Sequence, residues 1–477
     1  MAVVLIEIAI VGLAAAVLYA RKGNVGTDLA LLLTVGVIFG HPFFAIDLGP
    51  LPITIPRLLV GFLTLRWLLT VFRSEALPPT WGATETGLAG FLIFVAIQLA
   101  MTNWSFNEKK PLSYFLFFLL LPAIVYFVAS RTSFDERSIR RLRWALTAFG
   151  AYLAVTAVFE TRGLEALVFP RFIVSPEFEE YLGRARGPFL NPVANGIAMT
   201  MGMLSAATFW PEVGRRGRFL IAAYVLLTLL GVYLTYTRSC WMGAALGLGF
   251  LILWQLPARP RYALIVIGLV VGLPVLIQLK EASFKRDKHV TVEQMEESAS
   301  LRPLLAQAAW EILRDRPWTG VGYGQYLDHN RDYIERAITG RPLQRVSVYV
   351  QHNTVFALLA ETGLIGTSLF LLFVIGSVVA ALRLAFDRAI AWNLRCIAWI
   401  HLGTLSSTGF NSLWHDVLIE DGNFPMFTAL AGVTAAVLRA NRATIATEAP
   451  SREHLASLDP SRSDEAMIAT GSRSPAR

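Results

Sequence analysis

Charged residues and cysteines are both scarce in this chain of 477 residues. Only 16% of the residues are charged, against about 25% in an ordinary soluble protein. The two cysteines, Cys240 and Cys396, lie inside apolar runs, which excludes a disulfide scaffold and any CxxC-type metal or redox site. The chain also lacks HExxH, GxxxxGK[ST], GxGxxG and GxSxG motifs, so zincin, P-loop and α/β-hydrolase chemistry have no basis in it.

Apolar residues are in excess, at 55% of the chain with a mean hydropathy of +0.53. Many apolar runs approach the ~20 residues that a helix needs to cross a bilayer. The sequence therefore predicts an all-α polytopic membrane protein with about 12–13 transmembrane helices. The predicted spans are 2–20, 27–46, 53–72, 86–102, 112–130, 144–160, 193–210, 219–236, 240–256, 262–279, 354–382, 391–409 and 425–440. The weakest is 53–72, because it contains Arg57 and Arg66.

The positive net charge of +8 does not indicate a nucleic-acid partner. In membrane proteins Lys and Arg gather in the cytoplasmic loops, and here one set of short loops holds eighteen of them against about seven in the alternate set. The first set is therefore assigned to the cytoplasm, with the N-terminus outside. No basic region precedes the first apolar run, which is interpreted as a retained helix and not as a signal peptide.

The spans divide the chain into four parts. Residues 1–279 hold the first ten transmembrane helices and 353–442 hold the last ones. Between them, 280–352 form a large hydrophilic external loop, and 443–477, rich in Ser, Arg, Ala and Pro, are predicted to be a disordered cytoplasmic tail.

The external loop contains its own helical pattern. Apolar residues share one side of a predicted helix over Pro303–Leu313, which Asp315-Arg316-Pro317 ends. A turn-rich stretch, 320–324, follows. A long external loop on a membrane scaffold is where chemistry usually occurs.

Basic residues mark the external ends of several predicted helices. Arg184 and Arg186 precede the 193–210 span, Arg238 precedes the 240–256 span, and His352 stands where the long loop re-enters the membrane. Helix N-termini and guanidinium groups both bind anions, so this pattern predicts a phosphate or diphosphate receptor. The same positive field should lower the pKa of His352, which favours the neutral imidazole that a general base needs.

Structural interpretations compete with this one. A single arginine at a membrane border usually anchors lipid headgroups, and His352 beside Asn353 could simply cap or pack a helix. Glu160 and His41 are interpreted as interfacial, and the His415-Asp416 pair of the last external loop as more often structural than functional.

Ordered motifs between about 184 and 370 carry a family resemblance. They are Arg186-Gly187-Pro188-Phe189-Leu190-Asn191-Pro192, Thr237-Arg238-Ser239, Ser300-Leu301-Arg302 ahead of Trp310, the stretch Arg316–Gly324, His352-Asn353, and Glu361-Thr362-Gly363-Leu364-Ile365-Gly366. With this order and topology, the chain resembles the O-antigen ligase and polymerase superfamily of bacterial envelope glycosyltransferases.

The resemblance implies a GT-C-like, inverting enzyme of the bacterial inner membrane that uses no metal or cofactor. Such enzymes move a glycan from undecaprenyl diphosphate to an acceptor hydroxyl at the periplasmic face. By motif, the essential arginines and histidine correspond to Arg238, Arg302 and His352. The flanking motif residues Arg184, Arg186, Asn191 and Asn353 are predicted to bind substrate.

The sequence leaves the acceptor open. A ligase moves the glycan to lipid A–core, whereas a polymerase joins lipid-linked repeats; many members show Ser-Arg-Gly where this chain has Thr237-Arg238-Ser239, which puts the subgroup in doubt. A transporter or flippase of lipid-linked glycans is a further alternative. Transporters usually bind substrate near the middle of the membrane, often between repeated halves, and neither feature is evident here.

Overall fold

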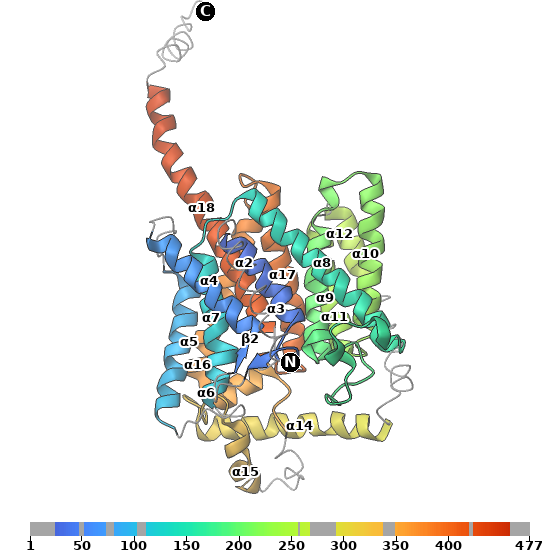
Figure 1. The fold of residues 1–477 in the computed structure, drawn as a ribbon. Coiled ribbons are helices and arrows are strands. Elements are labelled where there is room, and N and C mark those ends of the chain that lie inside the picture. The colour runs from blue at the N-terminus through green and yellow to red at the C-terminus, as the bar shows by residue number, and fades with distance from the viewer. Residues whose placement is uncertain are drawn as a thin grey trace, which may run out of the picture.

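The computed structural model describes residues 24–46, 52–72, 81–102, 111–255, 258–267, 292–336, 349–418 and 423–457, which form a bundle of helices (Figure 1). A short antiparallel pair joins β1 (Ala45–Ile46) to β2 (Ile53–Thr54). The helices are α2 (Val25–Leu33), α3 (Val35–Ile38), α4 (Ile55–Phe72), α5 (Ala83–Ala100), α6 (Pro111–Tyr114), the π-helical η1 (Phe115–Leu120), α7 (Leu121–Ser130), α8 (Glu136–Thr161), α9 (Pro192–Ala207), α10 (Arg215–Tyr233), α11 (Arg238–Gln255), α12 (Ala258–Ile267), α14 (Val292–Asp315), α15 (Tyr326–Arg336), α16 (Thr354–Phe386), α17 (Trp392–Ser412) and α18 (Asn423–Ser457). Short 3-10 turns cover Glu165–Leu167, Arg171–Val174, Gly187–Phe189 and Trp210–Glu212.

This architecture confirms the predicted all-α polytopic membrane protein. Within the described ranges, six helices are long and apolar enough to cross a membrane. The weakest predicted span is indeed a helix, α4, because its arginines find partners: Arg66 pairs with Asp28 of α2, and the Arg57 guanidinium lies 3.5 Å from the centre of the Phe117 ring. The predicted 2–20 span lies outside the described residues.

Two sequence predictions fail at helix ends. The predicted 27–46 span stops being helical after Ile38, because the chain turns around Pro42, which cannot continue a helix, and then enters β1. At the other end of the chain, α18 continues to Ser457, so the segment predicted to be disordered from residue 443 begins as a helix. Residues 458–477 lie outside the described part of the chain.

The centre of the bundle is α9, whose residues Pro192–Ala206 are all buried. It packs against α8 where Gly150 faces Gly202, and a Cβ on either glycine would overlap the backbone of the other helix. Helices in membranes associate through such small residues, because lipid offers no hydrophobic force to bring them together. The small residues of α9 therefore allow other helices to pack closely around it at the centre of the bundle.

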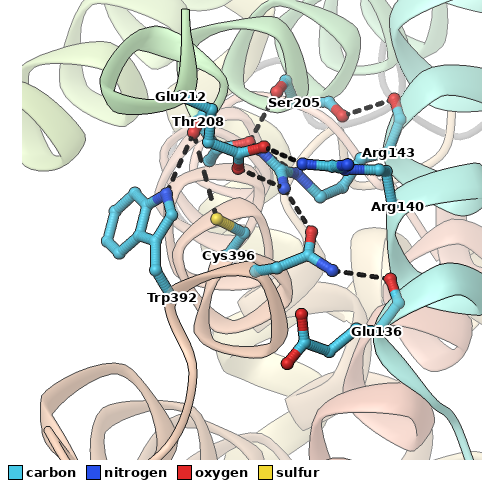
Figure 2. Close-up of polar contacts among 9 residues, drawn as sticks. Glu136, Arg140, Arg143, Ser205, Thr208, Glu212, Trp392 and Cys396 are labelled. Atoms are coloured by element: carbon cyan, nitrogen blue, oxygen red, sulfur yellow. Dashed lines mark hydrogen bonds and ion pairs between the residues drawn. The ribbon is translucent and has the colours of Figure 1, made fainter.

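A polar network closes one end of this centre (Figure 2). The buried Arg143 of α8 donates to Glu212 at 2.7 Å, to the Thr208 hydroxyl at 3.1 Å, and to Asn393 of α17. Glu212 also accepts from the exposed Arg140 at 2.8 Å. The network joins α8, the end of α9 and the start of α17, and it pairs the buried Arg143 charge with Glu212.

A transverse layer of helices covers one end of the bundle, opposite the end from which the C-terminal part of α18 extends. There α14 lies across the bundle, with α15 beyond it (Figure 1). The predicted apolar face is confirmed, since Leu301, Leu305, Ala308, Ala309 and Ile312 are buried. The helix begins at Val292, so Pro303 lies inside it and not near its start, and it ends at Asp315 as predicted.

The layer is attached where α16 is interrupted at Gly363, which has φ of 61° and ψ of −163°. The interruption leaves backbone groups of α16 without helical partners, and the stretch after α14 pairs with them. Val321 and Gly322 donate their N–H groups to the carbonyls of Ala360 and Glu361 at 2.9 and 2.8 Å. In return, the Leu364 and Ile365 N–H groups donate to the carbonyls of Pro317 and Trp318 at 2.8 and 3.2 Å.

Glycine is required at this crossing for two reasons. Gly320 and Gly363 both have positive φ, a conformation that side chains disfavour. In addition, a Cβ on Gly320 would overlap the Ala360 carbonyl oxygen, and one on Gly363 would overlap the backbone of Trp318. The Gly-rich stretch and the Glu361-Thr362-Gly363 motif are thus two halves of one contact.

Gly363→Ala should destabilise the protein, because alanine disfavours the positive φ at a cost of about 1–3 kcal/mol and its methyl group meets the Trp318 backbone. We expect a lower midpoint of thermal unfolding in detergent. The matched control is Gly409→Ala in α17, where nothing lies within 4 Å of an added Cβ. Equal midpoints for wild type and Gly363→Ala would contradict the interrupted helix.

The predicted topology can be tested at the two opposite ends of the bundle. Arg314→Cys, exposed on α14, should react with a membrane-impermeant maleimide in intact spheroplasts, whereas Arg442→Cys on α18 should react only after lysis. The two native cysteines are buried and give little background. Labelling of Arg442→Cys from outside would reverse the assigned orientation.

Candidate active site

Three helices begin close together near the α14 end of the bundle. The Cys240 thiol at the start of α11 lies 3.7 Å from the Pro192 carbonyl at the start of α9 and 3.6 Å from Asn411 near the end of α17. The residues that follow α17 contact the start of α16, as detailed below. The sequence predicted these three N-termini on one side, and the structure gathers them around the end of α17. The positive ends of their dipoles favour anions.

The candidate site is the place where Arg184, Arg238, Arg302, His352 and His415 act on one another electrostatically. Burial lowers the pKa of Arg302, and the charge of Arg238 lowers it further. Burial also lowers the pKa of His352, and the charge of Arg302 adds to that effect. A positive charge lowers the pKa of a neighbouring cation, and such an arrangement is stabilised by a bound anion.

The lowered pKa of His352 agrees in direction with the sequence prediction, but its causes differ. Burial of the imidazole is the larger cause and the Arg302 guanidinium the second, while Glu180 acts in the opposite direction. The prediction had attributed the shift to the positive field of the helix ends and arginines together. A neutral imidazole is the form able to take up a proton.

His352 also has an unusual backbone, with φ of 49° immediately before α16. Asn353 caps that helix: its side chain accepts from the Phe356 N–H at 3.0 Å and donates to the Leu413 carbonyl at 2.8 Å. The other non-glycine residues with positive φ include Tyr236, two residues before Arg238, and Tyr181, three before Arg184. Sparsely populated backbone conformations of this kind cluster at functional sites.

His415 is the residue that the sequence interpretation passed over. It lies in the α17–α18 connection, residues 413–418, and Thr354 donates to its carbonyl at 3.0 Å. Burial lowers the pKa of its imidazole to about 3, with the charges of Arg302, His352 and Arg184 adding to the effect. The available signal was its position in an external loop, on the same predicted side as the other candidates.

The two residues next to His415, Trp414 and Asp416, have different surroundings. Trp414 lies against Arg302, with the guanidinium carbon 5.7 Å from the ring centre. The Asp416 carboxyl is buried, which raises its pKa to about 6, and it acts on Tyr323 of the Gly-rich stretch. The connection therefore lies between two groups of residues. Through Trp414 it meets Arg302 of the basic cluster, and through Asp416 it acts on Tyr323, in the stretch that pairs with α16 at Gly363.

The structure does not place Arg186 with the other predicted substrate-binding residues. Its side chain is fully buried, and its guanidinium donates to the carbonyls of Ile173, Phe178, Glu180 and Ser175, with Glu160 at 3.8 Å. Glu160, interpreted from sequence as interfacial, is buried and accepts from the backbone N–H groups of Arg186 and Gly187, both at 3.2 Å. Arg186 thus holds the loop that presents Arg184, and we leave it out of the proposed substrate contacts.

Asn191 also has a structural role in this geometry. It caps α9 by accepting from the N–H groups of Val193 and Ala194 at 2.8 and 3.1 Å. Among the residues that the structure describes, no group of three or more His, Cys, Asp and Glu side chains could hold a metal ion.

Comparison with known families extends this assignment. Residues 223–371 match a family model described as O-antigen ligase. The matched region contains Arg238, Arg302 and His352, together with α14 and the interrupted part of α16. No curated protein matches the chain. The match over residues 223–371 supports an O-antigen ligase-like assignment for this chain, within the membrane proteins of polysaccharide biosynthesis.

Proposed function

We propose that the protein transfers a glycan from undecaprenyl diphosphate to an acceptor hydroxyl at the periplasmic face of the bacterial inner membrane. The observation that carries this proposal is the grouping of Arg302 with His352 and Arg238, and of Arg184 with Arg302 and His352 around His415, near three helix N-termini. A diphosphate is the anion best matched to such a set, because guanidinium groups bind its oxygens in pairs. The polyprenyl tail then lies among the membrane helices.

In the proposed reaction, the acceptor oxygen attacks the anomeric carbon of the donor sugar while the bond from that carbon to the phosphate oxygen breaks. His352 takes the proton of the acceptor hydroxyl. Undecaprenyl diphosphate leaves with the bonding electron pair, and Arg238 and Arg302 stabilise its growing charge. One displacement of this kind inverts the anomeric centre, and the arginines supply the electrostatic stabilisation without a metal.

The acceptor separates a ligase from a polymerase. We propose a ligase-like reaction with lipid A–core, or a surface glycan, as acceptor. The single long external segment fits a ligase or a ligase-like polysaccharide polymerase, so the acceptor must be tested directly. The deciding experiment supplies purified protein and an undecaprenyl-diphosphate glycan with either lipid A–core or a second lipid-linked repeat. Mass spectrometry of the products identifies the acceptor, and transfer in excess chelator tests the metal-free mechanism.

Arg302→Lys should lose most of the transfer activity in this assay, about 10-fold or more, because an ammonium group cannot form the paired contacts of a guanidinium. The matched control is Arg314→Lys, on the same helix with a side chain that is 66% exposed. We expect the control to keep wild-type rates. A fully active Arg302→Lys would assign Arg302 to lipid headgroups instead of the diphosphate.

His352→Asn separates a general base from a capping residue. Asparagine tolerates the positive φ of this position, and Asn353 still caps α16, so the fold and donor binding should persist. Transfer should nevertheless fall by about 10²–10⁴-fold, because an amide cannot accept the hydroxyl proton. An active His352→Asn enzyme would overturn the base assignment.

The wild-type rate should also depend on pH in a defined direction. The groups that face His352 are Arg302, His415 and Glu180, and burial together with Arg302 lowers its pKa below the usual 6.5. The imidazole is therefore neutral at pH 7, and the rate should fall only on acidification through this lowered pKa. The residual rate of His352→Asn should lack this acid limb.

A further inference from the structure

Hydrogen bonds to its backbone hold the α17–α18 connection in register with His352. Asn353 Nδ2 donates to the Leu413 carbonyl, and Thr354 Oγ1 donates to the His415 carbonyl while accepting from the Val417 N–H at 3.0 Å. The His415 N–H donates to the Asn411 carbonyl at 2.9 Å. At His415 these anchors use main-chain groups, so they leave its side chain available.

The imidazole of His415 lies within the electrostatic influence of three basic residues. Arg302, His352 and Arg184 all act on its imidazole, and they come from α14, from the start of α16 and from the loop before α9. Beside it, Trp414 lies over the Arg302 guanidinium. Among the described residues no hydrogen-bond partner is found for the half-buried imidazole of His415, although its backbone is fully engaged.

This environment favours an uncharged imidazole. A protonated His415 would add a third positive charge to those of Arg302 and Arg184, and burial opposes that charge as well. A neutral imidazole still carries one N–H donor and one acceptor nitrogen. It can therefore add a directed hydrogen bond to an anion without adding repulsion to the cluster.

We propose that His415 is a substrate-contacting residue of this site, which donates a hydrogen bond from its uncharged ring to an oxygen of the donor's diphosphate. The inference rests on the proposed function, because it needs a diphosphate among the three arginines. His352 and His415 then have separate roles. His352 takes the proton of the acceptor hydroxyl, and His415 binds the diphosphate leaving group. A neutral donor suits the second role because it stays protonated on its N–H throughout the reaction.

The test measures binding and transfer separately, on the full-length protein in nanodiscs. Binding of undecaprenyl diphosphate itself is measured by its displacement of a fluorescent polyprenyl diphosphate. His415→Ala should weaken binding about 10-fold or more, as loss of a hydrogen bond to a charged group does. Either His415→Gln or His415→Asn, depending on which places its amide N–H at the position of the ring N–H, should restore most of the lost affinity. His415→Phe should not restore it.

Two further readouts distinguish this role from a structural one. The acid limb of the rate should persist in His415→Ala, because His352 still titrates. The control variant is His329→Ala on α15, a half-buried histidine whose ring contacts the Gln325 carbonyl at 3.2 Å, and it should bind like wild type. Thermal unfolding of each variant identifies any loss of fold.

The possible failures are distinguishable. If wild type binds the diphosphate, Arg302→Met abolishes binding and His415→Ala binds normally, the inference about His415 is wrong while the proposed function stands. The same holds if neither amide variant exceeds His415→Phe. If wild type shows no affinity for undecaprenyl diphosphate, the proposed function fails, and this inference with it.

Discussion

A helix that is interrupted inside a membrane protein leaves N–H and C=O groups that lipid cannot satisfy, so protein must reach them. In this chain the interruption at Gly363 of α16 is satisfied by four backbone hydrogen bonds from residues 317–322. Those bonds fix where α14 ends, and α14 carries Arg302. The position of a guanidinium at the site thus depends on a backbone contact that contains no charged group.

Arginines have different neighbours in different parts of the bundle: some pair with carboxylates, and others lie near other basic groups. At the end shown in Figure 2, Arg143 is buried against Glu212 and Asn393, and elsewhere Arg439 pairs with Glu85. Such pairs satisfy charges that a low-dielectric interior would otherwise penalise. At the α14 end, the charge of Arg238 acts on Arg302, and Arg302 acts on both His352 and His415. Repulsion between like charges held in place by the scaffold is the physical basis of the anion binding that we propose there.

Much of this arrangement could be predicted from the sequence. Apolar runs predicted α4, α5, α7 to α11 and α16 to α18, and the periodicity of residues 303–313 predicted the buried face of α14, because both depend on local pattern. Arg184 and Arg186 could not be told apart, since the carbonyls that enclose Arg186 converge only when residues 173–180 fold around it. His415 was passed over for a similar reason: a contact with Thr354, distant in sequence, brings it to the site.

Asn353 and Thr354 anchor the α17–α18 connection, so residues outside the family-matched region lie beside residues inside it. The family match ends at residue 371, whereas Trp414 and His415 follow it and Arg184 precedes it. The site that we propose therefore extends beyond the region shared with the family on both sides. Divergence in the flanking helices can reshape the walls around a common centre, which gives evolution a route to new glycan substrates without altering the matched motifs.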